Sequence, residues 1–211
     1  MSVDDLYDAI IDGDKNNAAV QTQQALDADI SPEAILHETC IPAMSEVGDL
    51  FEASEIFIPE MLIAARAMQS VMDILKPRLI ADGIDVVGSI VMGTVRGDMH
   101  DIGKNLVIMM LEGAGFEVID LGIDVPPEAF VEAVRKHKPD LLGMSALLTT
   151  TMTEIGNTVA ALTEAGLRDA TKILIGGAPV TKEYADKIGV EGFAEDASRA
   201  ARIAKELLAI A

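Results

Sequence analysis

The 211-residue sequence contains no tryptophan, one cysteine and only 3% aromatic residues. Any core must therefore be built mainly from aliphatic side chains and methionine, and a single cysteine, Cys40, excludes an internal disulfide framework. No apolar run approaches the roughly 18–20 residues that a membrane-spanning helix needs. Residues 1–14 are acidic and lack the basic start and apolar run of a secretory signal, which predicts a cytoplasmic location and no membrane association.

Basic residues are also scarce. The chain has 16 lysine and arginine residues against 35 aspartate and glutamate residues, and its formal net charge is −19. Nucleic-acid binding needs a cationic surface that displaces counterions, so this composition argues against a nucleic-acid partner. An acidic surface keeps a protein soluble, and it also steers docking onto partners with basic faces.

The first part of the chain, residues 2–82, has apolar residues at helical spacing throughout. Ser31, Pro32 and Glu33 together are typical of a helix start with proline in the first turn. A helix is expected over residues 34–51, bent or interrupted at Pro42, and another over residues 58–80. Four such helices predict a small bundle, a first domain over residues 1–84.

The second part, residues 85–211, alternates β-type runs with helical segments. This alternation predicts an α/β domain with a five-stranded parallel sheet covered by helices on both faces. Five strands favour a flavodoxin-like order, although the strand order itself stays open. Strands are expected at 86–95, 117–121, 141–145, 172–175 and near 192–193, and helices at 103–112, 127–137, 152–164, 182–187 and 197–209. Ligands of such folds bind at the carboxyl ends of the strands, which directs attention to the turns after Val95, Ser145 and Ile175.

The turn after the first expected strand is rich in glycine. Gly93, Gly97 and Gly103 match neither the G-x-G-x-x-G spacing nor the G-x-x-x-x-G-K-[ST] spacing, so a nucleotide phosphate loop is excluded. The same turn contains Asp98-x-His100-x-x-Gly103. An aspartate two residues from a histidine can accept one ring N–H and leave the other nitrogen free as a metal ligand.

A zinc or non-haem iron site needs several protein ligands, and the chain has no such cluster of cysteine and histidine residues. One histidine suffices where a macrocycle, a haem or a corrin, already supplies the equatorial ligands. The alternative is that His100 only caps the following helix or satisfies a loop.

At this point the sequence resembles a known family. Residues 97–105 (GDMHDIGKN) look like the cobalamin-binding signature of B12-dependent methionine synthase and of the small corrinoid proteins of methyl transfer. Residues 144–151 (MSALLTTT) resemble the second binding loop of that family, and residues 175–179 (IGGAP) resemble the third. Residues 47–52 (VGDLFE) and 57–61 (FIPEM) are similar to its helical cap. The resemblance covers essentially the whole chain.

The resemblance implies a corrinoid cofactor (cobalamin or methylcobalamin) with His100 as the lower axial ligand of cobalt. It implies that Asp98 hydrogen-bonds His100, and that Thr151, where the family has a serine, completes the relay. Ser145 and Thr149 are expected to bond the displaced nucleotide tail, with Gly143, Gly176 and Gly177 leaving space beside it. Phe51, Phe57, Ile58 and Met61 are expected to cover the upper face. The remaining expected cofactor-binding residues come from the same loops: Gly97, Met99, Asp101, Gly103 and Leu147.

The function implied by the resemblance is a methyl shuttle that is not catalytic alone. Co(I) would accept a methyl group from a substrate:corrinoid methyltransferase, with methylamines or quaternary amines favoured as substrates and methanol or aryl methyl ethers as alternatives. A corrinoid:acceptor methyltransferase that uses folate or coenzyme M would then remove it, and a reductive activase is a third expected partner. Three further classes of protein stay open: the corrinoid domain of a radical mutase, a B12-based sensor and a receiver-like module without cofactor.

Overall fold

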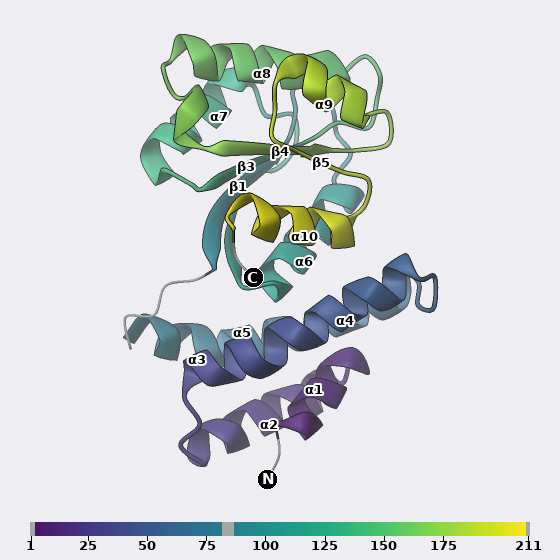
Figure 1. Cartoon of the computed structure of the whole chain (residues 1–211), viewed down its shortest axis with the longest axis vertical. Coiled ribbons are helices and arrows are strands. Elements are labelled where there is room, and N and C mark those ends of the chain that lie inside the picture. Colours follow the sequence, from purple (N-terminus) through teal and green to yellow (C-terminus); the bar gives the residue numbers. More distant parts are fainter. Residues whose placement is uncertain (1–2, 82–86, 210–211) are drawn as a thin grey trace. The chain divides into compact units, whose positions relative to one another are not determined.

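The computed structural model describes residues 3–81 and 87–209 and divides into two compact units (Figure 1). The first unit contains the helices that precede Val87, together with the segment Glu112–Gly115. The second unit contains Val87–Leu111 and Phe116–Ala211. The domain boundary expected between residues 84 and 85 lies outside the described residues, as does the expected first strand residue, Val86.

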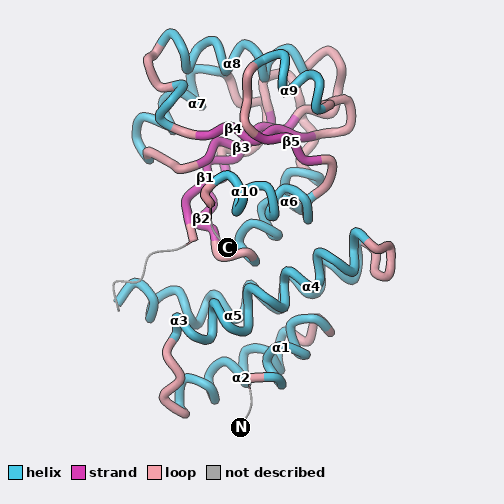
Figure 2. Tube along the Cα trace, viewed as in Figure 1, coloured by secondary structure: helices cyan, strands magenta, loops and turns pink. Residues whose placement is uncertain are grey.

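The first unit is helical, as its sequence periodicity predicts. Its elements are α1 (Asp4–Ile11), α2 (Lys15–Asp27), α3 (Pro32–Ala34), a π-helical segment (Ile35–Cys40), α4 (Ile41–Glu52) and α5 (Ile58–Ala81). Helices α1 and α2 lie against α4 and α5 (Figure 2). The core of this unit is aliphatic and rich in methionine. It includes Leu6, Ile10, Ile35, Leu36, Met44, Met61, Met68 and Leu75, and it also buries Cys40.

Pro42 does not end its helix. The helix runs from Pro32 to Glu52 and changes its hydrogen bonding over Ile35–Cys40, where the Ile41 N–H donates to the carbonyl of Leu36, five residues earlier. A proline ring clashes with the carbonyl four residues before it in a regular α-helix, and a π-turn widens the backbone at that point. The expected disturbance is therefore a widened turn just before Pro42 rather than a break.

The second unit is a five-stranded parallel sheet. Its strands are β1 (Gly88–Thr94), β2 (Phe116–Asp120), β3 (Leu141–Ser145), β4 (Lys172–Gly176) and β5 (Gly192–Ala194), in the order β2-β1-β3-β4-β5. All four strand pairs are parallel. This is the flavodoxin-like strand order, which was favoured by the sequence because five strands were expected.

Helices cover both faces of this sheet. Helices α7 (Pro127–His137), α8 (Met152–Glu164) and α9 (Lys182–Ile188) lie on one face, and α6 (Ile102–Gly113) and α10 (Ala197–Leu207) lie on the other (Figure 1). The core beneath α7 to α9 contains alternate residues of the strands, among them Val91, Leu142, Met144, Ile173 and Ile175, which pack with Phe130 and Ile155. In the part of the chain that the structure describes, no helix is both long and apolar enough to cross a membrane.

The strand register determines which loops meet. Thr94 pairs with Ser145, and Ser145 pairs with Gly176, so the last residues of β1, β3 and β4 form one row. The loops that follow these strands therefore emerge side by side at the carboxyl edge of the sheet. These are the three turns in which the sequence placed its candidate residues.

Candidate functional site

The buried carboxylate of Asp98 organises the loop after β1. Its Oδ1 accepts hydrogen bonds from His100 Nδ1 at 2.7 Å and from the His100 main-chain N–H at 3.1 Å. Its Oδ2 accepts hydrogen bonds from the Thr151 hydroxyl at 2.6 Å and from the Leu147 N–H at 2.7 Å. The side chain of Asp98 is 0% exposed, so four donors satisfy a carboxylate that has no access to water.

These donors determine the charge of Asp98. Burial by itself raises the pKa of this carboxyl, but the hydrogen bonds from Thr151, Leu147 and His100 outweigh that effect and hold the pKa well below its usual range. Asp98 is therefore ionised at neutral pH and acts only as an acceptor. A neutral His100 ring must then carry its proton on Nδ1, which leaves the lone pair on Nε2.

His100 itself lies partly in solvent. Its side chain is 50% exposed, although Asp98 holds one edge of the ring. The sequence pattern predicted this pair, and the resemblance added Thr151; the structure brings all three together in one hydrogen-bonded chain. A half-exposed imidazole whose Nδ1 is held by a buried carboxylate has the form of a metal-binding histidine.

Thr94 is a residue of this site that sequence reasoning missed. It ends β1, is 0% exposed, and its Oγ1 lies 3.0 Å from the carbonyl oxygen of His100 and 2.9 Å from Ser145 Oγ. Its position at the end of the first strand was the only available signal, because its contact with Ser145 depends on the strand register.

Two further interactions support the loop and were also missed. Lys104, whose side chain is 2% exposed, contacts both carboxylate oxygens of Asp120 at 2.7 and 2.6 Å and thereby ties the first turn of α6 to the end of β2. Asp124 accepts a hydrogen bond from the Gly97 N–H at 2.6 Å, and its own N–H donates to the carbonyl of Asp98 at 3.0 Å. A lysine in the first turn of a helix that continues with the apolar run 106–111 was a usable signal for the first pair.

At several of the predicted glycines, the fold of the protein itself explains why no larger residue is present. Gly97 has a φ of +77°, a backbone conformation that favours glycine. Gly177 has a φ of +119°, and a Cβ there would lie 1.9 Å from the carbonyl oxygen of Ala146. A Cβ on Gly176 would lie 3.0 Å from the carbonyl oxygen of Ala194, and one on Gly143 would lie 1.9 Å from Met92 Sδ. The position that a Cβ would take on Gly143, Gly176 or Gly177 is therefore occupied or crowded by protein atoms.

Gly103 differs from these glycines. It lies in the first turn of α6, its φ is not positive, and a Cβ on it would meet no described atom within 4 Å. Glycine costs stability inside a helix, so the fold of the ligand-free chain gives no reason for it here. A molecule that closely approaches the backbone would supply the reason.

The two loops that meet at Asp98 expose apolar side chains. Among the described residues of the second unit, the large apolar side chains that are exposed are Met99, Ile102, Leu147 and Leu148, with exposed fractions of 64%, 78%, 42% and 43%. All four belong to the loops that carry His100 and Thr151 or to the adjoining first residue of α6. An apolar surface gathered around one polar ring is typical of a binding site for a large, partly apolar ligand.

The remaining predicted residues of this unit surround the same edge. Ser145 is half-buried beside Thr94, and Thr149 is exposed in the loop before α8. Asp101 is exposed immediately before α6, where its carboxylate accepts a hydrogen bond from Asn105 Nδ2 at 3.3 Å. Each of these residues is placed where a ligand at the strand ends could contact it.

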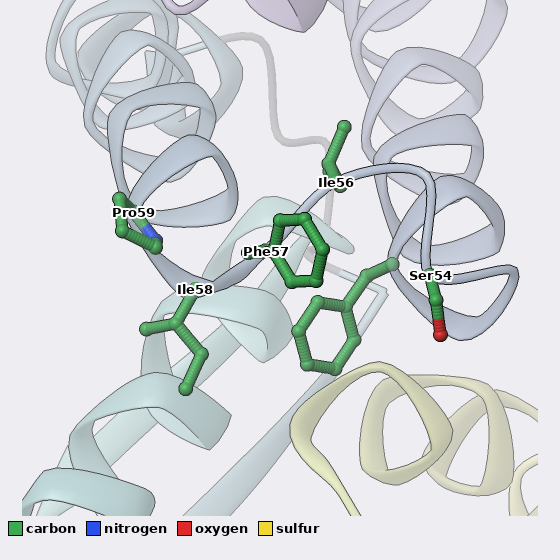
Figure 3. Close-up of a pocket in the computed structure, with 6 residues that line it drawn as sticks. Ser54, Ile56, Phe57, Ile58 and Pro59 are labelled. Atoms are coloured by element: carbon green, nitrogen blue, oxygen red, sulfur yellow. The ribbon is translucent and has the colours of Figure 1, made fainter.

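In the helical unit, the predicted cap residues fall into two groups. Phe57 and Ile58 are 64% and 46% exposed, and with Phe51 they help to line an open hollow of about 450 Å³ at the turn between α4 and α5. Ile56 and Ile58 point away from one another on either side of Phe57 (Figure 3). Met61 is only 1% exposed and belongs to the core of the unit. The structure therefore gives Met61 a packing role and leaves the aromatic turn as the exposed surface.

The donor set bears on the kind of metal that the site could take. Among residues 3–81 and 87–209, no group of three or more histidine, cysteine, aspartate or glutamate side chains could hold a metal ion. A metal that uses His100 must therefore bring most of its ligands with it. A single held imidazole, an apolar surround and the unexplained Gly103 together fit a corrinoid, whose ring already ligates cobalt.

Comparisons with known proteins agree with this fit. The sequence model of a family described as B12 binding domain matches residues 88–202, and a second model with the same description matches residues 3–76. Trimethylamine corrinoid protein 1 of Methanosarcina acetivorans is 43% identical over 193 residues, which cover 90% of this chain and 89% of that protein.

Two solved structures extend the likeness to the whole fold. A cobalamin-binding protein from Desulfitobacterium hafniense DCB-2 is 32% identical, with a TM-score of 0.83 over 98% of both chains. The methanol:cobalamin methyltransferase complex MtaBC from Methanosarcina barkeri contains a chain that is 31% identical, with a TM-score of 0.84 over 97% of this chain and 78% of that one. This protein therefore belongs to the B12-binding corrinoid proteins, and its cofactor is a corrinoid.

Proposed function

We propose that this chain is the corrinoid-carrying methyl shuttle of a methyltransferase system, with methylamines as the favoured substrate class. Curated relatives from Methanosarcina acetivorans named trimethylamine and dimethylamine corrinoid proteins support this class, at 42–44% identity over at least 90% of this chain. A bound corrinoid supplies the cobalt centre that receives and releases the methyl group. The protein supplies the axial nitrogen, the apolar surface and the docking faces.

In this proposal His100 Nε2 would hold the cobalt of the corrinoid. Asp98, ionised by its hydrogen bonds from Thr151 and Leu147, accepts the Nδ1 proton and keeps the ring in the ligating tautomer. A metal held by His100 would need the lone pair of Nε2, so a proton on that nitrogen would compete with the metal. The Asp98–His100 pair is the observation that carries the proposal.

The other parts of the chain have separate proposed tasks. Residues 85–211 form the corrinoid domain, in which Ser145, Thr149 and the loop at Gly176 and Gly177 contact the nucleotide tail. Residues 1–84 form a cap whose exposed apolar turn, with Phe57 and Ile58, shields the cofactor from water. The chain is not catalytic alone and works in the cytoplasm.

The proposed partners are separate proteins: a donor methyltransferase, an acceptor methyltransferase that uses folate or coenzyme M, and a reductive activase. Methanol is a second candidate substrate, favoured by the TM-score of 0.84 to a chain of a methanol:cobalamin methyltransferase complex. Mixing the loaded protein, chemically reduced to Co(I), with donor methyltransferases for trimethylamine, dimethylamine and methanol and with their substrates would distinguish these classes. The absorbance change of the corrinoid on methyl uptake is the readout, and a response to methanol alone would overturn the methylamine assignment.

Electron paramagnetic resonance of the Co(II) protein tests the axial ligand. The wild type should show nitrogen splitting from His100, and His100→Ala should retain the corrinoid but lose the splitting that comes from protein. His137→Ala is the matched control, because His137 is an exposed residue at the end of α7. Identical spectra for His100→Ala and the wild type would refute the assignment.

A further inference from the structure

The main chain of His100 is held independently of its ring. Its N–H donates to Asp98 Oδ1 at 3.1 Å, and its carbonyl oxygen lies 3.0 Å from Thr94 Oγ1. Asp98 therefore fixes the ring and the amide, whereas Thr94 fixes the peptide that leads out of His100 towards Asp101. No regular secondary structure holds residues 96–101, so these side-chain contacts set the position of the histidine.

Thr94 can serve as a fixed point because its own backbone is held on both sides. Its N–H donates to the carbonyl of Gly122 at 3.0 Å, and its carbonyl accepts from the Val125 N–H at 2.9 Å. The neighbouring residue, Val95, donates to the carbonyl of Ser145 at 3.1 Å. The branched side chain of threonine is also stiff at χ1, so the position of its buried hydroxyl follows from the position of the strand.

The direction of the hydrogen bonds follows from counting protons. A carbonyl oxygen only accepts and a hydroxyl has one proton, so Thr94 must donate to His100. The contact at 2.9 Å between Thr94 Oγ1 and Ser145 Oγ is then a hydrogen bond only if Ser145 donates to Thr94. The Thr94 hydroxyl thus accepts a hydrogen bond from Ser145 and donates one to the main-chain carbonyl of His100.

We propose that Thr94 is a positioning residue that couples Ser145 to the main chain of His100. This inference rests on the proposed function, in which His100 ligates cobalt and Ser145 contacts the nucleotide tail. If the nucleotide tail accepts the hydrogen bond of the Ser145 hydroxyl, Thr94 loses that donor. The hydrogen bond from Thr94 to the main-chain carbonyl of His100 then changes in strength or geometry. Occupancy at Ser145 and ligation by His100 are therefore linked through one side chain.

The test uses Thr94→Val, which keeps the shape of the side chain and removes the hydroxyl, and Thr94→Ser, which keeps the hydroxyl. Each full-length variant is loaded with cob(II)alamin, and the fraction that shows protein nitrogen splitting is measured by electron paramagnetic resonance. Thr94→Val should lower the ratio of ligated to unligated protein by about three- to tenfold, the size expected for one hydrogen bond. Thr94→Ser should restore most of that ratio.

A matched control separates positioning from general destabilisation. Thr158 is a 0% exposed threonine of α8, and its hydroxyl donates to the main-chain carbonyl of Glu154 at 2.9 Å. Thr158→Val should destabilise the fold without changing the nitrogen splitting. Combining Thr94→Val with Ser145→Ala should give less than the product of the two separate effects, because both variants remove the same link.

The possible negative results distinguish failure of the proposed function from failure of the Thr94 coupling. If His100→Ala keeps the wild-type splitting, the proposed function fails, whatever Thr94 does. If the splitting depends on His100 but Thr94→Val matches the wild type, the coupling alone is refuted. An equal loss in Thr94→Val and Thr158→Val would also refute the coupling, since the effect would then be one of stability.

Discussion

The hydroxyl of Thr151 donates to Asp98 Oδ2 at 2.6 Å, although the two residues are 53 positions apart in the sequence. Through this bond the first residue before α8 helps to set the charge of a carboxylate that holds a histidine in another loop. The bond stays within the second unit, and both of its side chains are buried. It links the stability of the fold to the ligating state of His100.

Removal of the Thr151 hydroxyl should therefore weaken the fold. Thr151→Val leaves one Asp98 lone pair without its donor, and we expect a loss of about 1–3 kcal/mol in the free energy of unfolding. Thr151→Ser keeps the donor and should lose less than about 1 kcal/mol. Urea unfolding of the three proteins checks this, and a serine variant as weak as the valine variant would show that packing of the methyl group dominates.

The charge of Asp98 should appear as a dependence of stability on pH. Its pKa in the folded protein lies below the value of about 3.9 of an unfolded aspartate, so ionised Asp98 stabilises the folded state above that pH. This contribution declines as the pH falls below about 4. The difference in unfolding free energy between wild type and Asp98→Asn should be constant, at about 1–3 kcal/mol, from pH 5 to 7 and shrink in acid. Asp186→Asn, at an exposed ion pair, should show a difference near zero, and a gap for Asp98→Asn that grows in acid would contradict the assigned direction.

Gly103→Ala should have opposite effects on the free and the loaded protein. Alanine favours the helix and meets open space, so the ligand-free protein should gain about 0.5–1 kcal/mol of stability. A methyl group that intrudes on the corrinoid costs roughly 1–3 kcal/mol, so affinity should fall by about fivefold to 150-fold. Gly156→Ala in α8, whose Cβ would lie 3.5 Å from Tyr184 Oη, is the control that gains stability and leaves affinity unchanged. Equal affinities of the two variants, measured by corrinoid titration, would show that Gly103 is not near the ligand.

Met92 and Gly143 form a packed pair that can be tested by a double-mutant cycle. A Cβ at residue 143 would lie 1.9 Å from Met92 Sδ, so Gly143→Ala should cost about 1–3 kcal/mol unless the methionine moves. Met92→Ala leaves a cavity, and the double variant should recover part of the loss because the methyl group added at residue 143 occupies part of the space that Met92→Ala opens. Thermal unfolding measures the coupling, and strictly additive losses would rule out the pair as the cause.

Much of this architecture could be predicted from the sequence. Apolar periodicity identified the helices of the first unit and the alternating strands and helices of the second, and the Asp98-x-His100 spacing identified the central pair. Thr94, Asp120 and Asp124 could not be found in this way, because their contacts depend on strand register and on loops from distant parts of the chain. The structural reason for each glycine was still harder to predict. Sequence alone does not distinguish Gly177, which lets two backbones meet, from Gly103, which faces open space.

The four hydrogen bonds of Asp98 come from two loops, and its main chain contacts a third, the one after β2. These loops meet only after β1, β2 and β3 have paired, and parallel pairing of this kind is a slow, long-range event in folding. A short peptide that contains the histidine motif would therefore not hold its ring. The Asp98–His100–Thr151 contacts can therefore form only once the segment up to Thr151 has been synthesised and β1, β2 and β3 have paired.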